Sequence, residues 1–237
     1  GFSGGDLDTD TYNLTYYSTS PLEKDNRYLD TIIGIGVLKS DITNVLDGNR
    51  LHGDRNGKQI YGTLKLKNEI KKGEVTFIPA GQLDLGYTLL DSYSESGNTA
   101  MRFEDQSIQS KNVRLSVAAF DQLQRNKYNI RRHQKLEYKV DFDRSSNVKY
   151  SYISDTSNTE FDTKLTTGAL HNFIAETGFD LIFDDNLSLF LIYEQIYELG
   201  VGYSNKLNLA LGYLPNKETK YTFSLKESED LVSNFEI

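Results

Sequence analysis

Apolar and polar residues alternate along much of this chain, and the alternation is clearest between residues 77 and 88. The odd positions hold Phe77, Pro79, Gly81, Leu83, Leu85 and Tyr87, and the even positions hold Ile78, Ala80, Gln82, Asp84, Gly86 and Thr88. A period of two is typical of a β-strand whose two faces differ in polarity. The apolar face of such a strand meets either a protein core or membrane lipid. The environment of Asp84 therefore distinguishes a water-soluble sheet from a membrane barrel.

The same period recurs in short segments separated by turn-rich stretches, which is typical of an all-β protein. About twelve strands are predicted, at residues 11–19, 26–39, 58–70, 77–90, 112–120, 135–142, 148–154, 173–183, 187–194, 206–214, 220–225 and 231–237. Residues 1–10 are expected to form a linker or tail, and residues 11–237 one β-domain. Three longer connections, rich in Asp, Asn, Ser and Gly, predict exposed loops at 40–57, 91–107 and 154–171.

One feature of this strand assignment is inconsistent with a barrel. In an up-and-down barrel the long loops lie on one rim and the short turns on the other. The twelve predicted strands place the loop at 154–171 on the rim opposite to the other two long loops. We therefore expect that one strand between residues 107 and 160 is split or missed.

The polar faces of the predicted strands carry charges of both signs together with small residues. Glycines at positions 34, 36, 86, 178 and 212 suit a curved and crowded interior, where large neighbours need room, better than a solvated exterior. The opposite faces are rich in Leu, Ile, Val, Phe and Tyr. The pattern favours an antiparallel up-and-down transmembrane β-barrel of about 12 strands over a soluble sandwich or barrel. The candidate lumen-facing residues are Asp30, Lys65, Asp84, Arg114, Glu176 and Asp180.

Composition removes several other classes of protein. The net charge is −8, with acidic and basic residues mixed along the chain, which argues against a nucleic-acid partner. Cysteine is absent, so a disulfide, a thiolate nucleophile and a Cys-ligated zinc are excluded. The sequence contains no run of about 18 apolar residues, so no transmembrane helix is predicted. The mean hydropathy of −0.52 does not exclude a β-barrel, because only every second strand residue needs to be apolar.

The candidates for chemistry favour structural roles. His52, His133 and His171 are far apart and lack metal-ligand spacing, so no metal or cofactor is predicted. Glu176 and Asp180 on one strand face would lie about 13 Å apart, too far for a glycosidase pair within the strand. Lumen carboxylates are expected to form ion pairs instead. No nucleophile and base can be named, and we expect no enzyme, although a hydrolytic barrel stays open as an alternative.

Several segments, taken in order, resemble the C-terminal translocator barrel of autotransporters. They are "RYLDTIIGIG" (27–36), "GKQIYGTLKLKNEI" (57–70), "FIPAGQLDLGYTLLDSYSESG" (77–97), "NVRLSVAA" (112–119) and "ETGFDLIFDDNLSLFLIYE" (176–194). The motif residues within them are Pro79, Tyr87, Tyr93, Glu95 and Gly97. The chain departs from the family where it runs past "YTFSL" to Ile237 instead of ending on an aromatic residue. It also shows no passenger, no linker helix and no Trp, so we expect a fragment truncated at both ends.

The resemblance implies a translocator in a Gram-negative outer membrane that anchors and exports an N-terminal passenger. Its expected partners are outer-membrane lipid, the outer-membrane barrel assembly machinery and its own passenger domain. A soluble all-β ligand-binding module and a porin-like or hydrolytic barrel remain the alternative functions.

Overall fold

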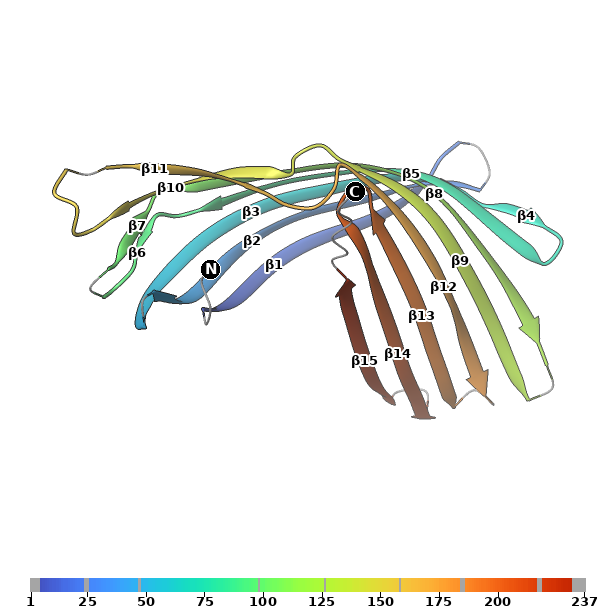
Figure 1. The fold of residues 1–237 in the computed structure, drawn as a ribbon. Helices are drawn as coiled ribbons and strands as arrows, with labels where there is room; N and C mark the ends of the chain where they lie inside the picture. The colour runs from blue at the N-terminus through green and yellow to red at the C-terminus, as the bar shows by residue number, and fades with distance from the viewer. Residues whose placement is uncertain are drawn as a thin grey trace.

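The chain is built almost entirely of β-strands. The computed structural model describes residues 5–23, 26–46, 48–97, 99–125, 127–157, 159–183, 186–216 and 219–231. Ten strands follow one another as an antiparallel meander (Figure 1). They are β1 (Asp6–Pro21), β2 (Arg27–Leu46), β3 (Asn49–Asn68), β5 (Val75–Leu90), β8 (Gln106–Gln124), β9 (Tyr128–Asp141), β12 (His171–Phe183), β13 (Leu187–Glu198), β14 (Gly202–Asn216) and β15 (Thr219–Leu231). No helix that could cross a bilayer occurs in the described part of the chain.

Short turns join most neighbouring strands of the meander. Gly48 and Gly73 adopt φ angles of +79° and +63° in two of these turns, a backbone region that glycine enters at little cost. The turn at Gly73 lies between β5 and the short strand β4 (Ile70–Lys72), which continues β3 in the same register. Along β5, the pairing with β3 begins at Ala80. Pro79, the residue before it, has no backbone N–H, so it cannot donate a hydrogen bond where this pairing is interrupted.

A second, four-stranded sheet lies beyond one rim of the meander (Figure 1). Its strands are β6 (Tyr93–Ser94), β7 (Met101–Phe103), β10 (Ser145–Tyr152) and β11 (Phe161–Thr166). All four come from the two long connections, β5 to β8 and β9 to β12. We call this element the loop sheet.

The loop sheet corrects the predicted strand count. The predicted strand at 148–154 corresponds to β10. This strand pairs with β7 and β11 and not with the meander. Without it, the connections from β5 to β8 and from β9 to β12 fall on the same rim. The predicted strand count placed long loops on both rims because it counted β10 as a strand of the meander.

Two predicted boundaries are also wrong. Residues 6–10, expected in a tail, extend β1 and pair with Lys39–Thr43 of β2. Residues 40–57, expected as a loop, form a long hairpin of β2 and β3 around Gly48. Both segments are mostly polar, with only scattered apolar residues such as Ile42 and Leu51, and they therefore lacked the alternation used to assign strands. Most of the last predicted strand, 231–237, lies outside the described residues.

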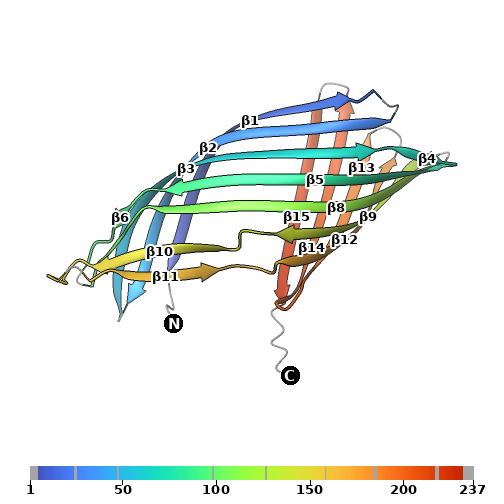
Figure 2. The same ribbon diagram turned by 90° about the horizontal axis from the view of Figure 1, so that it is seen from above.

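The meander is strongly curved, and its strand directions turn from β1 to β15 until the first and last strands run almost crosswise (Figure 2). The pairing register is staggered accordingly. One row of directly opposed residues begins at Ser20, near the end of β1, and finishes at Leu231 on the opposite rim. The intermediate members of this row are Leu29, Leu66, Gly81, Leu115, Tyr138, Phe173, Tyr197 and Tyr203. A stagger of this kind accompanies strand tilt in β-barrels. In the described residues, β1 and β15 are the unpaired outer strands of the sheet.

Glycines on the polar face give room to large neighbours. A Cβ atom at Gly34 would lie 2.2 Å from the ring of Tyr61, which reaches across β2 to hydrogen-bond Thr15 at 2.5 Å. A Cβ atom at Gly178 would lie 2.4 Å from the ring of His133. Small residues on this face therefore leave space for side chains of the next strand, because an inward-curving face is crowded.

Candidate functional site

The two faces of the meander differ in both polarity and crowding. Glu137 is only 7% exposed, whereas its neighbour Leu136 on the opposite face is 69% exposed. Successive residues of a strand point to opposite faces, so this contrast repeats along β5, β8 and β9. We call the crowded side the polar face and the other side the apolar face. The apolar face exposes many large hydrophobic side chains, among them Leu64, Leu83, Leu115 and Val117.

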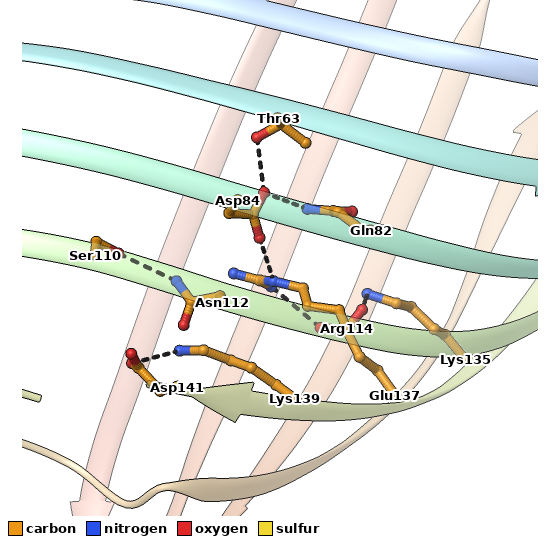
Figure 3. A network of polar contacts seen from close by, with 10 residues as sticks. All are labelled: Thr63, Gln82, Asp84, Ser110, Asn112, Arg114, Lys135, Glu137, Lys139 and Asp141. Carbon is orange, nitrogen blue, oxygen red and sulfur yellow. Dashed lines mark hydrogen bonds and ion pairs between the residues drawn. The ribbon is translucent and has the colours of Figure 1, made fainter. Parts of the chain in front are cut away.

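A network of ion pairs and hydrogen bonds crosses the centre of the polar face (Figure 3). Arg114 Nε donates to Asp84 Oδ2 at 2.8 Å, and an Nη1 hydrogen of Arg114 goes to Glu137 Oε1 at 3.1 Å. Lys135 Nζ lies 2.7 Å from the other oxygen of Glu137. Asp84 Oδ1 also accepts from Thr63 at 2.7 Å and from Gln82 at 2.8 Å. The strands β3, β5, β8 and β9 are thereby joined through side chains.

The network is balanced in charge. It holds two carboxylates, Asp84 and Glu137, and two cations, Arg114 and Lys135. Each carboxylate is neutralised by a neighbouring cation. Such an arrangement stiffens the wall and keeps charge on the polar face, which suits a structural role.

The other predicted lumen residues lie on the same face but outside this network. Asp30 pairs with Lys67 at 2.8 Å rather than with Lys65, which lies directly opposite in the register. Glu176 Oε1 lies 3.1 Å from His133 Nε2. One carboxylate oxygen of Asp180 is buried without a hydrogen-bond partner among the described residues. Of the six predicted residues, only Asp84 and Arg114 form an ion pair with each other.

The Tyr-x-Glu-x-Gly motif fastens the loop sheet to the tip of β3. The ring of Tyr93 packs on Gly53, and burial raises the pKa of Tyr93 to about 12. The buried Glu95 accepts hydrogen bonds from the Asn44 amide and, at 3.2 Å, from the backbone nitrogen of Met101. Gly97 has a φ of +132°, and a Cβ atom there would lie 2.5 Å from the buried Leu51. The motif residues Pro79 and Tyr87 lie in β5, on the apolar face.

Arg55 is the main contact residue that the sequence analysis missed. Its Nε donates to the Asp91 carbonyl at 2.8 Å, and its Nη atoms donate to Gln106 and to the Glu104 carbonyl, both at 3.1 Å. Its guanidinium also lies over the ring of Tyr93, 5.3 Å from the centroid. Residues 40–57 were expected to be a loop, so Arg55 had no assigned face. The Asp47-Gly48 dipeptide, a strong hairpin signal, would have placed it on the polar face of β3.

Acidic residues oppose one another beyond the apolar stretches of β1, β2 and β3. Asp41 lies directly between Asp8 and Asp54 in the register. The hydrogen bond with Asp54, followed by burial and by the charges of Asp54, Asp8 and Asp10, raises the pKa of Asp41 above its ordinary value. Like charges that face one another across strands destabilise a sheet. A carboxyl group whose pKa is raised on folding opposes folding while it is ionised, and this opposition disappears as the pH falls through the raised pKa.

We therefore expect Asp41→Asn to stabilise the protein at neutral pH and to have no such effect once Asp41 is protonated in the parent protein. Asp121→Asn is the control of opposite sign, because the hydrogen bond from Arg132 lowers the pKa of Asp121. Asp121 stabilises the fold above its unfolded-state pKa, and that contribution is lost as the pH falls. Urea unfolding in lipid vesicles at several pH values measures both. A destabilising Asp41→Asn at neutral pH would contradict the repulsion.

Comparisons with known proteins match this architecture. Residues 1–194 match the family model described as the autotransporter β-domain. The solved translocator domain of the autotransporter NalP from Neisseria meningitidis superimposes with a TM-score of 0.53 at 10% identity, over 95% of this chain and 75% of that chain. The ferric yersiniabactin uptake receptor FyuA from Yersinia pestis superimposes with a TM-score of 0.42 at 10% identity, over 95% of this chain and 43% of that chain. No curated protein matches the sequence.

Proposed function

Because this chain belongs to the autotransporter β-domain family, we propose that its polar face lines the pore through which its passenger crosses the outer membrane. The chain is the outer-membrane translocator for a passenger in a Gram-negative bacterium, and it is not an enzyme. The soluble ligand-binding module and the hydrolytic barrel, left open by the sequence pattern, are set aside by this membership.

The observation that supports this proposal is the difference between the two faces. Charged and hydrogen-bonding groups gather on the crowded side, and exposed Leu, Ile, Val and Phe residues gather on the other side. Membrane β-barrels have this polarity, with apolar side chains toward lipid and polar side chains toward the lumen. Asp30, Lys65, Asp84, Arg114, Glu176 and Asp180 are accordingly proposed as lumen residues.

Lipid and the barrel assembly machinery are the further partners that we propose. The apolar face is suited to the acyl chains of the outer membrane. In the described residues, the outer strands β1 and β15 leave backbone groups unpaired, and each such group costs several kcal/mol in hydrocarbon. A sheet with such edges needs a protein that shields them during insertion, which is the role expected of the assembly machinery.

Paired cysteine substitutions test the assignment of faces. These 237 residues contain no cysteine, so Ser116→Cys on the polar face and Leu115→Cys on the apolar face each provide one thiol in this domain, at adjacent positions. In intact outer membranes we expect a small water-soluble maleimide to label Cys at position 116 and to spare Cys at position 115. The reverse pattern, or equal labelling, would contradict the pore assignment.

A stalled passenger provides the second measurement. A passenger that folds prematurely and stops in transit should protect position 116 from the maleimide, because the polypeptide fills the pore. Unchanged labelling at position 116, with the passenger demonstrably stalled, would place the polypeptide path outside the polar face.

A further inference from the structure

The apolar side of the loop sheet continues the polar face of the meander, so the two sheets differ in which side is apolar. One side of its strands carries Tyr93, Phe103, Tyr150, Tyr152 and Phe161, and the other side carries Ser94, Arg102, Lys149, Ser151 and Asp162. Beyond the membrane a sheet is surrounded by water, so its polar side is expected to face outward and its apolar side inward.

Four rings on the apolar side form a continuous row across the four strands. Tyr93 stacks on Phe103 with centroids 4.7 Å apart, Phe103 lies 5.8 Å from Tyr150, and Tyr150 stacks on Phe161 at 5.4 Å. Tyr152 meets Phe161 edge to face at 5.9 Å. We call Tyr93, Phe103, Tyr150 and Phe161 the aromatic row.

The aromatic row continues the polar face of the wall. Tyr93 packs against Gly53 and beneath Arg55, which share the polar face of β3 with Tyr61. At a second point Gln106, on the same face of β8, donates to the hydroxyl of Ser146 at 3.0 Å. The row therefore begins where the proposed pore lining ends, and it extends away from the wall strand by strand.

The outer part of this aromatic surface has no cover in the described part of the chain. Phe161 is 39% exposed, and the meander strands that contact the loop sheet, β3 and β8, lie at its base. A soluble sheet normally buries such a surface against another layer. A partner that reaches this side is therefore needed to remove the rings from water.

We propose that the aromatic row receives the passenger polypeptide, in extended form, as it leaves the pore. This inference rests on the proposed function, and it names the surface that the passenger meets first outside the membrane. The row adjoins the proposed pore lining directly, so a chain that emerges along that lining passes next to the rings. Ring faces bind methylene groups, other rings and cations without requiring one sequence, which suits a passenger whose residues pass one after another.

Site-specific photocrosslinking in the full-length autotransporter tests this proposal. The photoreactive residue p-benzoyl-phenylalanine replaces Phe161 in one variant and Asp162, its neighbour on the opposite side, in the control. We expect a covalent adduct with the passenger from position 161 and none from position 162. Tyr152 is a second position on the aromatic side, and heat-modifiable gel mobility verifies that each variant is folded.

Passenger exposure to external protease, measured in the same cells, separates the two proposals. An exposed passenger with no adduct from position 161 or 152 would overturn the aromatic row and leave the pore function intact. Adducts with glycolipid or with a second barrel in place of the passenger would also overturn it. A passenger that fails to reach the surface from the parent protein would instead contradict the proposed function.

Discussion

The substitution Leu83→Arg is expected to destabilise the protein in a bilayer by roughly 2 to 4 kcal/mol, the cost of Arg at the midplane on the lipid side of a β-barrel. Leu83 lies in the middle of β5, between Leu64 and Val113 of the neighbouring strands, and 38% of it is exposed on the apolar face. The guanidinium would enter hydrocarbon with no acceptor nearby. Urea unfolding in lipid vesicles, followed by gel mobility, gives the change in the free energy of unfolding.

Gln82→Arg is the matched control for this prediction. Gln82 is adjacent in sequence but lies on the polar face, where its side chain already donates to Asp84 at 2.8 Å. An Arg at this position keeps an anionic partner and is expected to cost much less. If the two substitutions destabilised the protein equally, the assignment of lipid and pore faces would be wrong.

Removing Arg114 is expected to have the second large effect, a loss of about 3 kcal/mol on Arg114→Ala, near the lower end for breaking a buried ion pair. Among the described residues, Arg114 is the one cation that contacts both Asp84 and Glu137, and Glu137 is almost fully buried. Without it, Asp84 keeps Thr63 and Gln82 as donors but loses its ion pair with Arg114, and Glu137 keeps Lys135 as its remaining cation. The free energy of unfolding in lipid vesicles is again the measurement.

Two further substitutions separate the network from charge in general. Asp84→Asn should cost less than Arg114→Ala, because Glu137 still holds the guanidinium and the new amide oxygen can still accept from Thr63. Lys111→Ala removes the ion pair of a half-exposed lysine with Asp143 and is expected to cost much less. A loss on Arg114→Ala no greater than that on Lys111→Ala would show that the network adds nothing to stability.

The period-two pattern was sufficient to assign most strands of the meander, and it placed the six candidate charged residues on one face. It placed Asp84 and Arg114 on one face, and the structure brings them into contact across β5 and β8. It did not predict which cation pairs with each carboxylate. Asp30 pairs with Lys67 and not with Lys65, because the choice depends on side-chain direction and strand tilt, which the alternation does not contain.

The errors of the sequence analysis share one physical cause. Alternation reports that two faces differ, but it does not report what covers each face or which strands pair. Strand β10 alternates like a wall strand, yet its eight residues are shorter than the about 9–11 that a transmembrane strand needs. The upper parts of β2 and β3 have the reverse problem, because they are paired strands in water and carry polar residues on both faces.

The loop sheet has a consequence for how the protein enters the membrane. In outer-membrane barrels the longer loops face the cell exterior, so residues 91–105 and 142–170 must cross the bilayer during insertion with charged residues such as Arg102, Glu104 and Lys149. Once these segments pair into four strands and stack their rings, they can return only by unfolding. The pairing and ring stacking of the loop sheet would therefore oppose the return of these segments through the membrane.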